Sequence, residues 1–242
     1  MTVQRNNKSA PSKIGVWRMF DKIAKRYDFL NRLLSLRRDV AWRKKLARFI
    51  PKRQGLNILD LATGTADVLL TIEKQVQNIH IAIGLDMATG MLEIGRRKVQ
   101  AKGALSKILL LPGDALHIPV KENHFDVVTM AFGIRNVVKI ERCLNEMNKV
   151  LKPDGRALVL EFSLPENNFF QKAYLFYFRH VLPEIGGMLS GDRNAYNYLN
   201  KSVESFPYGE PFCRLLEQSG FVNVKAMPLT FGIATLYLGD KK

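Results

Sequence analysis

Three aspartates near the ends of successive apolar runs are the residues of this chain best suited to bind a ligand. They are Asp60 in the run 57–62, Asp86 at the end of the run 79–86, and Asp114 after the run 107–112. An acid placed like Asp86 can accept hydrogen bonds from both ribose hydroxyls, and one placed like Asp114 can accept from an adenine amino group. One such acid would be weak evidence, because strands of α/β proteins often end in aspartate. Three in succession favour a nucleoside pocket.

The segment that follows the first aspartate is a turn of small residues, Thr63-Gly64-Thr65, before a predicted helix. Small residues let the backbone approach a ligand closely, and the N-terminus of the helix offers unpaired N–H groups. A dinucleotide enzyme is the main alternative, but its G-x-G-x-x-G pattern is reduced here to one glycine, with alanine at positions 62 and 66. Because alanine leaves less room for a pyrophosphate, the loop favours a ligand that lacks one.

Short apolar runs alternate with helical stretches after Gly55, and these elements must hold the aspartates together. The predicted strands are 57–62, 79–86, 107–112, 125–131 and 157–162, and the predicted helices between them are 67–76, 88–103 and 138–151. This alternation implies right-handed crossovers and a mostly parallel sheet with helices on both faces. Two further strands, 222–229 and 233–238, are joined by a Thr-Phe-Gly turn and predict a hairpin that adds an antiparallel edge. We therefore expect a seven-stranded α/β fold.

The chain before residue 55 carries most of the positive charge. The whole sequence has 37 Lys and Arg against 22 Asp and Glu, a net charge of +15. Residues 13–53 hold fourteen basic and three acidic residues, which is +11 of that total. Apolar residues recur at steps of three and four from Trp17 to Leu34, the period of an amphipathic helix. Its basic side is either a solvated helix face or a surface that meets acidic lipid or nucleic acid.

Composition narrows the class of protein further. With 242 residues, 47% of them hydrophobic and 24% charged, the chain is typical of a globular protein, and disordered or collagen-like classes are excluded. Two cysteines are too few for a disulfide framework, so we expect a reducing, cytoplasmic compartment. Because residues 1–13 are polar, we expect no signal peptide there, and charges interrupt the apolar stretch 173–189. Any membrane contact is therefore expected to be peripheral, and four histidines without ligand spacing predict no metal site.

The aspartates and the small-residue loop resemble those of class I S-adenosylmethionine (SAM) methyltransferases, and longer motifs resemble one family among them. These motifs are Tyr27-Asp28-Phe29-Leu30-Asn31 with Ser35 and Trp42, Phe132-Gly133-Ile134-Arg135-Asn136, Val150–Arg156 leading to Leu160-Glu161-Phe162-Ser163, His180–Pro183, and Tyr196–Leu199. Through almost the whole chain they are similar to the ubiquinone/menaquinone biosynthesis C-methyltransferase family. The chain departs from the family's usual residues at Leu30 (Met), Arg37 (Gly), Asp39 (His), Asp114 (Asn) and Ala131 (Ser).

The resemblance implies a Rossmann-like class I methyltransferase fold that uses SAM as its cofactor. In that superfamily the acid and loop after the first strand bind the methionine portion, and the acid of the second strand binds ribose. The expected cofactor-binding residues are Asp60, Thr63, Gly64, Thr65, Asp86, Met87, Asp114 and Ala115. We expect residues 55–242 to form the methyltransferase domain, with 1–54 as a basic helical segment covering the site. Residues 168–199 would be a helical insertion that acts as a substrate lid.

The resemblance also implies that the substrate is a polyprenylated quinol, methylated at a ring carbon that becomes nucleophilic when a phenolic proton is lost. Residues after the fourth strand lie where open α/β sheets place their ligands, and a guanidinium there would favour the phenolate. The expected catalytic residues are Arg135, Asn136, Tyr27 and Asp28. An alternative for Arg135 is pairing with a carboxylate to hold its loop, and Glu161 is a candidate partner. His180 stays open as the base.

Two other function classes remain open, an RNA methyltransferase and a non-catalytic basic adaptor on a degenerate cofactor fold. The net charge of +15 favours the first, but the sequence after the fourth strand lacks an Asn-Pro-Pro-Tyr type signature, so we expect no nucleic-acid partner. A prenyl tail would keep the substrate in a bilayer, and we therefore expect peripheral association with the membrane surface. The sequence does not distinguish a benzoquinol from a naphthoquinol, and a homodimer stays open.

Overall fold

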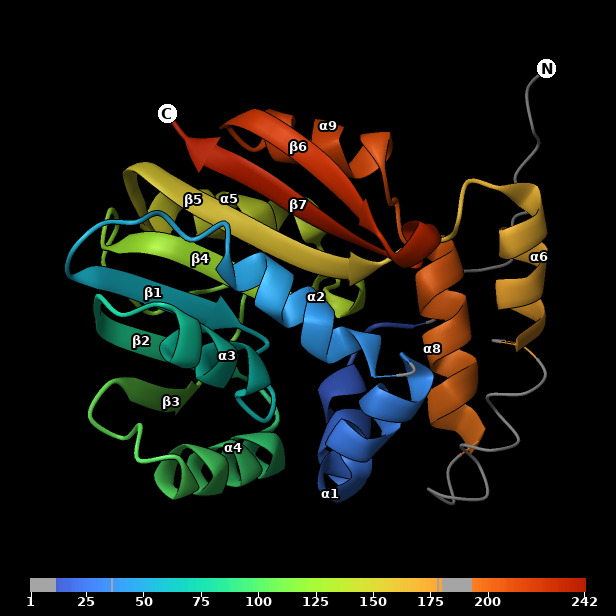
Figure 1. Ribbon diagram of the computed structural model, residues 1–242, viewed down its shortest axis with the longest axis horizontal. Helices are drawn as coiled ribbons and strands as arrows, with labels where there is room; N and C mark the ends of the chain where they lie inside the picture. The colour runs from blue at the N-terminus through green and yellow to red at the C-terminus, as the bar shows by residue number, and fades with distance from the viewer. Residues whose placement is uncertain (1–11, 36, 178, 180–192) are drawn as a thin grey trace.

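The computed structural model describes residues 12–35, 37–177, 179 and 193–242, and its centre is a seven-stranded sheet (Figure 1). The strand order is β3-β2-β1-β4-β5-β7-β6. The strands are β1 Leu56–Leu61, β2 Ile79–Asp86, β3 Ile108–Pro112, β4 Phe125–Ala131, β5 Leu151–Phe162, β6 Phe221–Leu229 and β7 Ala234–Lys241. The first five strands pair in parallel, whereas β7 is antiparallel to both β5 and β6. The predicted mostly parallel sheet with an antiparallel C-terminal hairpin is confirmed.

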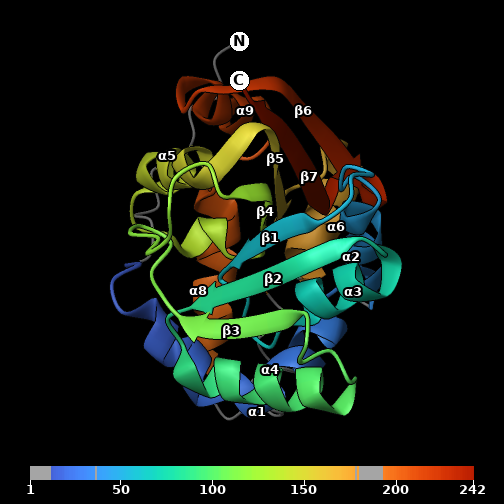
Figure 2. The same cartoon turned by 90° about the vertical axis from the view of Figure 1, so that its left-hand side faces the viewer.

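Helices cover both faces of the sheet, as the apolar character of the strands predicts (Figure 2). One face packs against α2 Arg38–Ala47, α3 Asp67–Gln75 and α4 Thr89–Ala101, and the other packs against α5 Ile140–Val150 and α9 Glu210–Gln218. Strand β1 contributes to both layers, because Ile58 packs on the first face and Leu59 and Leu61 pack on the second. All three side chains are fully buried. The strands are therefore held from both sides, which fixes the loops at their ends.

The carboxyl ends of the parallel strands face two further helices, α1 Val16–Leu34 and α8 Arg193–Ser205 (Figure 1). Helix α1 packs on α4 through Phe20 and Ala24, which meet Ala88 and Met91. Helix α8 meets the short helix η1 Ile134–Asn136, which follows β4. A shorter helix, α6 Asn168–Phe176, lies beyond α8. The predicted amphipathic N-terminal helix is thus present, and it lies over the edge of the sheet where the predicted site residues gather.

The junction between α1 and α2 is a tight turn at Arg37, whose φ of 62° lies in the left-handed region. Glycine is the residue that adopts such a φ without strain. Polar contacts to Asp39 hold the start of α2. Ser35 Oγ donates to Asp39 Oδ1 at 2.7 Å, and Arg43 Nη1 donates to Asp39 Oδ2 at 2.5 Å. Both members of that ion pair are buried.

No helix within the described ranges is long and apolar enough to cross a bilayer. Within the same ranges, no group of three His, Cys, Asp or Glu side chains could hold a metal ion. Cys143 and Cys213 are both free thiols. Of the expected lid 168–199, the structure describes α6, Tyr177, Arg179 and the first half of α8, while His180 lies outside the described residues.

Candidate active site

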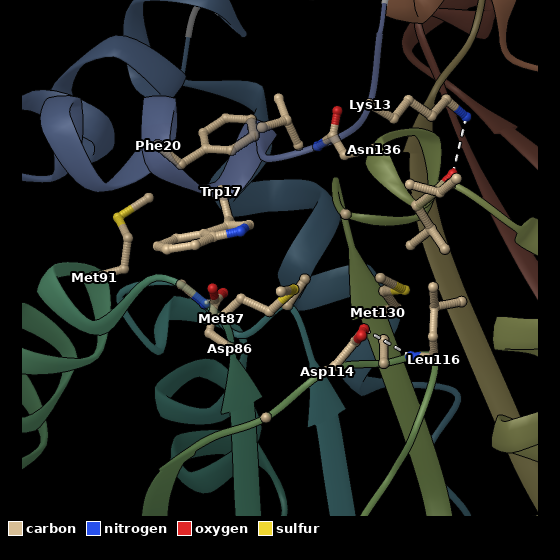
Figure 3. A pocket seen from close by; sticks show the side chains of 18 of the residues that line it. Lys13, Trp17, Phe20, Asp86, Met87, Met91, Asp114, Leu116, Met130 and Asn136 are labelled. Atoms are coloured by element: carbon tan, nitrogen blue, oxygen red, sulfur yellow. Dashed lines mark hydrogen bonds between the residues drawn. The ribbon is translucent and has the colours of Figure 1, made fainter.

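A cavity of about 270 Å³ lies between the start of α1 and the carboxyl ends of β1 to β4 (Figure 3). Trp17 and Phe20 of α1 form one wall, opposite Asp86 and Met87 at the end of β2. The predicted site residues that line it are Gly64, Asp86, Met87, Asp114, Ala115 and Asn136. The predicted residues with described side chains that lie outside this lining are Asp60, Thr63, Thr65, Arg135 and Asp28. The side chain of Tyr27, on α1, is outside the described set.

The loop after β1 keeps the backbone shape of a glycine-rich loop although two of its positions are alanine. Ala62, Gly64 and Ala66 all have positive φ, at 49°, 56° and 66°. A Cβ atom added to Gly133 would lie 2.6 Å from Cβ of Ala62, so the loops after β1 and β4 are in close contact. The alanine methyl occupies space that glycine would leave open. This agrees with the expectation of a narrow loop.

Asp86 joins the first two loops of the site. Its Oδ2 accepts from the backbone N–H of Gly64 at 2.8 Å, and its Oδ1 accepts from that of Ala88 at 2.8 Å. Burial raises the pKa of Asp86, and these backbone bonds oppose that rise. Each carboxylate oxygen retains a second lone pair. Asp86 can therefore accept the hydroxyls of a ribose while it holds Gly64 in position.

Asp60 lies beneath the loop, 1% exposed, and does not reach the cavity. Its carboxylate accepts from Thr63 Oγ1 at 2.6 Å and from Thr129 Oγ1 at 2.6 Å. Burial raises its pKa to about 7, although both hydroxyls favour the ionised form. Asp60 therefore supports the loop from behind and brings a titratable charge under the place predicted for the methionine portion of the cofactor.

The charged groups of the cavity fit SAM better than they fit a dinucleotide. Among the described lining residues, the charged side chains are the carboxylates Asp86 and Asp114 and the ammonium of Lys13. The Lys13 group is already engaged, since its Nζ donates to the carbonyl of Val137 at 3.1 Å, and burial lowers its pKa. Asp114 Oδ1 accepts from the N–H of Leu116 at 2.9 Å, which fixes the turn after β3. Two carboxylates suit a cationic sulfonium nucleoside, whereas a pyrophosphate needs cations or free N–H donors.

Arg135 forms a buried ion pair behind the cavity. Its Nη1 donates to Glu161 Oε1 at 2.6 Å and to the carbonyl of Phe132 at 2.7 Å. Arg135 is 3% exposed and Glu161 is fully buried. This pairing is the structural alternative that the sequence left open for Arg135. The buried Nε of Arg135 has no acceptor among the described residues.

Asn136, next to Arg135 on η1, lines the cavity directly. Its Oδ1 accepts from the hydroxyl of Tyr198 on α8 at 3.1 Å. With the oxygen of the amide engaged in this way, the nitrogen is directed towards Trp17 and the cavity (Figure 3). The sequence singled out the motif that contains Tyr198 but gave Tyr198 no role, because a contact between residues 62 positions apart leaves no local pattern.

Asp28 ties α1 to the cofactor loop instead of lining the cavity. Its Oδ1 accepts from Thr65 Oγ1 at 2.6 Å, and its Oδ2 accepts from Lys98 Nζ at 2.9 Å. Lys98, on α4, also pairs with Asp67 at the start of α3. The ammonium therefore links three helices around Thr65. The helix that covers the site and the loop expected to bind the cofactor share one polar network.

Comparisons with known proteins agree with this geometry. The model of the ubiE/COQ5 methyltransferase family matches residues 2–241. A ubiquinone/menaquinone biosynthesis C-methyltransferase UbiE from Geotalea uraniireducens is 46% identical, over 92% of this chain and 94% of that protein. A demethylmenaquinone methyltransferase from Thermus thermophilus is 43% identical, over 92% of this chain and all of that protein.

Among solved structures, a SAM-dependent methyltransferase from Thermotoga maritima superposes with a TM-score of 0.63. The two are 19% identical, and the match covers 93% of this chain and 99% of the other, which supports the class I fold. The family model spans nearly every residue, including the loops that form the cavity. This chain belongs to the ubiE/COQ5 methyltransferase family.

Proposed function

We propose that this protein transfers a methyl group from SAM to a ring carbon of a polyprenylated quinol. The observation that carries the proposal is the composition of one cavity. It presents Asp86 and Asp114 for the nucleoside, an apolar wall from α1, and the amide of Asn136 beside the buried pair of Arg135 and Glu161. Relatives that match 92% of this chain are named for the same chemistry.

The residues that would hold SAM come from three loops. Asp86 would accept from the ribose hydroxyls and Asp114 from the adenine amino group. Thr63, Gly64 and Thr65 would contact the methionine portion, with Asp60 beneath them. SAM supplies an electrophilic methyl group when bound. The aspartates and the loop orient it and offset its positive charge, while α1 keeps water from the cavity.

The quinol must lose a phenolic proton, whose usual pKa is roughly 10, before its ring carbon becomes a good nucleophile. We infer that Asn136 donates through its amide nitrogen to a quinol oxygen and orients the ring. Arg135 lies behind Asn136, where its charge would favour the phenolate, although Glu161 offsets part of that charge. Tyr27 stays a catalytic candidate on α1, and Asp28 would hold that helix closed.

We infer that three parts of the chain have separate roles. Residues 55–242 would form the catalytic domain, residues 1–54 would cover the site, and residues 168–199 would form a lid over the substrate. Tyr174 on α6 is buried against the sheet, and Tyr198 on α8 reaches Asn136, so both helices of the proposed lid adjoin the site.

A quinol with a prenyl tail resides in a bilayer, so the enzyme must reach the membrane surface from the cytoplasm. We propose that the basic segment 13–53, with a net charge of +11, holds the protein reversibly at an anionic leaflet. No transmembrane anchor is needed for this contact, since Lys and Arg near anionic lipid each contribute about 1 kcal/mol.

Quinone extraction from a bacterial strain that lacks its own enzyme tests the reaction. With this gene expressed, we expect mass spectrometry to show a gain of one methyl group on the accumulated precursor. A methylated naphthoquinone would identify the naphthoquinol as acceptor, and a methylated benzoquinone would identify the benzoquinol. Unchanged precursors, with the protein folded and expressed, would contradict the proposal.

The two other function classes receive no support from the family match. A non-catalytic adaptor would bind no SAM, so isothermal titration calorimetry with purified protein separates it from an enzyme. An RNA methyltransferase would methylate transcripts in the same strain while leaving the quinone pool unchanged. We expect SAM binding and no methylation of RNA.

A further inference from the structure

Three phenylalanines form an exposed cluster away from the cavity, here called the aromatic tip. Phe169 is 77% exposed, Phe170 is 44% exposed and Phe231 is 74% exposed. The rings of Phe170 and Phe231 stack with centroids 5.1 Å apart at 11°, and Phe169 meets Phe170 edge-on at 5.8 Å. The aromatic tip, which is formed by α6 and the turn between β6 and β7, therefore exposes a large apolar surface to solvent. Such a cluster is typical of a binding surface.

The backbone under the aromatic tip is strained, which indicates that an aromatic residue there has a use. The turn between β6 and β7 is η3 Thr230–Gly232, and Thr230 and Phe231 have φ of 46° and 58°. Asparagine and glycine are the usual residues at such positions in a hairpin, because a bulky side chain is unfavourable there. Phe231 nevertheless occupies the turn and leaves its ring exposed.

A strongly basic surface adjoins the aromatic tip. The outward side of α2 and its preceding turn, here called the basic face, carries the exposed residues Arg37, Arg38, Lys44, Lys45 and Arg48. The acid in this helix, Asp39, is 2% exposed and bound to Arg43, so it does not offset the exposed charge. Trp42, on the inner side of α2, donates through Nε1 to Thr230 Oγ1 at 2.8 Å. This bond fixes the basic face next to the turn that carries Phe231.

Figure 1 shows the β6–β7 turn between α2 and α6, and the Trp42–Thr230 bond and the Phe170–Phe231 stack link the turn to these two helices. We propose that the aromatic tip inserts into the headgroup region of an anionic bilayer while the basic face binds the lipid phosphates. Aromatic rings are favoured at that depth, and a basic patch beside an apolar one provides the two signals that stable but reversible binding needs. The inference rests on the proposed function, because it gives the docking surface for a substrate carried in the membrane.

The test compares the Phe231→Ser variant, which leaves the proposed lid intact, with a matched control, Leu105→Ser. Leu105, in the turn before β3, is 59% exposed, so the control removes an exposed apolar side chain elsewhere. Each protein is sedimented with vesicles of phosphatidylglycerol and phosphatidylcholine. Each is also assayed with a long-chain quinol in those vesicles and with a short-chain quinol in solution.

We expect the phenylalanine variant to bind vesicles at least about tenfold more weakly, since it loses an aromatic ring that would be buried in the headgroup region. Its turnover of the vesicle-borne quinol should fall likewise, while turnover of the soluble quinol and all values for the control stay near wild type. Equal loss on both quinols, or no loss on either, would overturn the docking surface. Loss of a wild-type dimer in the phenylalanine variant, seen by analytical ultracentrifugation, would assign the tip to a second copy and overturn it too. Wild-type inactivity on both quinols would instead contradict the proposed function.

Discussion

At Asp86 the same carboxylate organises the loop and would bind the cofactor. We predict that Asp86→Ala weakens SAM binding by about 1.5–3 kcal/mol, because two ribose hydroxyls lose their acceptor and Gly64 loses its anchor. Calorimetry measures the affinity. The matched control is Asp126→Ala. Asp126 also accepts a backbone N–H, from Asn57 at 2.9 Å, and it pairs with Lys152, but it lies near the amino end of β4, away from the cavity. Equal affinity loss in both variants would remove Asp86 from the cofactor site.

The buried pair of Arg135 and Glu161 requires a different experimental design, because removing one charge leaves the other buried without a partner. We predict that Arg135→Met lowers the free energy of unfolding by about 3–5 kcal/mol, and that Arg135→Met/Glu161→Leu recovers much of that loss. Urea denaturation measures both. The double variant should still bind SAM but lose most turnover, because the charge favouring the phenolate is gone. Near wild-type turnover in a folded double variant would show that the pair serves only to hold the loop.

Asp60 makes the stability of the protein depend on pH. Its pKa of about 7 in the folded state lies above its usual value near 4, so the folded protein binds more protons than the unfolded chain between those values. The contribution of Asp60 to the free energy of unfolding is therefore expected to be greatest below about pH 4, and it is lost as pH rises through 7. We predict that Asp60→Asn reduces this slope between pH 5 and pH 8, measured by urea denaturation. A slope as steep as that of the wild type would contradict the raised pKa.

Among the helices and strands, the sequence predicted those that are specified by a pattern within a short stretch of residues. The apolar runs 79–86 and 125–131 match β2 and β4, and the Thr-Phe-Gly turn is present in the hairpin. Strand β5 starts earlier than predicted, at Leu151 instead of Ala157. The strand continues through Pro153-Asp154-Gly155, residue types that are common in turns, with a register shift against β4 and a φ of 58° at Asp154. Pairing with neighbouring strands overrides the local signal there.

The site was predictable only in part, for a related reason. The acids at strand ends identify the loops, since parallel strands must bring these loops together. The direction of a side chain depends on partners that are distant in sequence. Asp28 turns to Lys98, 70 residues away, and Lys13 reaches Val137, 124 residues away. Helix α9 was missed because its segment carries no motif, although Pro211 near its start is a common helix-initiating residue.

The turn between α1 and α2 offers a direct test of backbone strain. We predict that Arg37→Gly stabilises the protein by about 0.5–1 kcal/mol, because relief of the left-handed φ outweighs the added freedom of glycine in the unfolded chain. Arg38→Gly is the matched control. It lies in the first turn of α2, where glycine should destabilise by up to about 1 kcal/mol. Thermal unfolding of both variants measures the difference, and a lower midpoint for Arg37→Gly than for Arg38→Gly would contradict it.

For the whole molecule, the question is whether charge acts through its total or through its position. We predict that reversal to glutamate at Arg37, Arg38, Lys44 and Lys45 abolishes most binding to anionic vesicles, and that wild-type binding falls with salt as the Debye length drops below about 8 Å. The control reverses four exposed lysines outside α2, Lys102, Lys121, Lys139 and Lys225, for the same change in net charge. Vesicle sedimentation should separate the two sets. Equal losses would indicate a general charge effect.

The position of β7 inside the sheet has a consequence for synthesis on the ribosome. Strand β5 ends at Phe162, but its free edge is covered only by β7, which begins at Ala234. Between them the chain makes α6, α8, α9 and β6. A nascent chain therefore exposes the open edge of a nearly complete hydrophobic sheet until residues 234–241 emerge from the exit tunnel. During that interval the unpaired edge of β5 is a template for pairing with other chains. Protection by a trigger-factor type chaperone is therefore needed most at this late stage of translation.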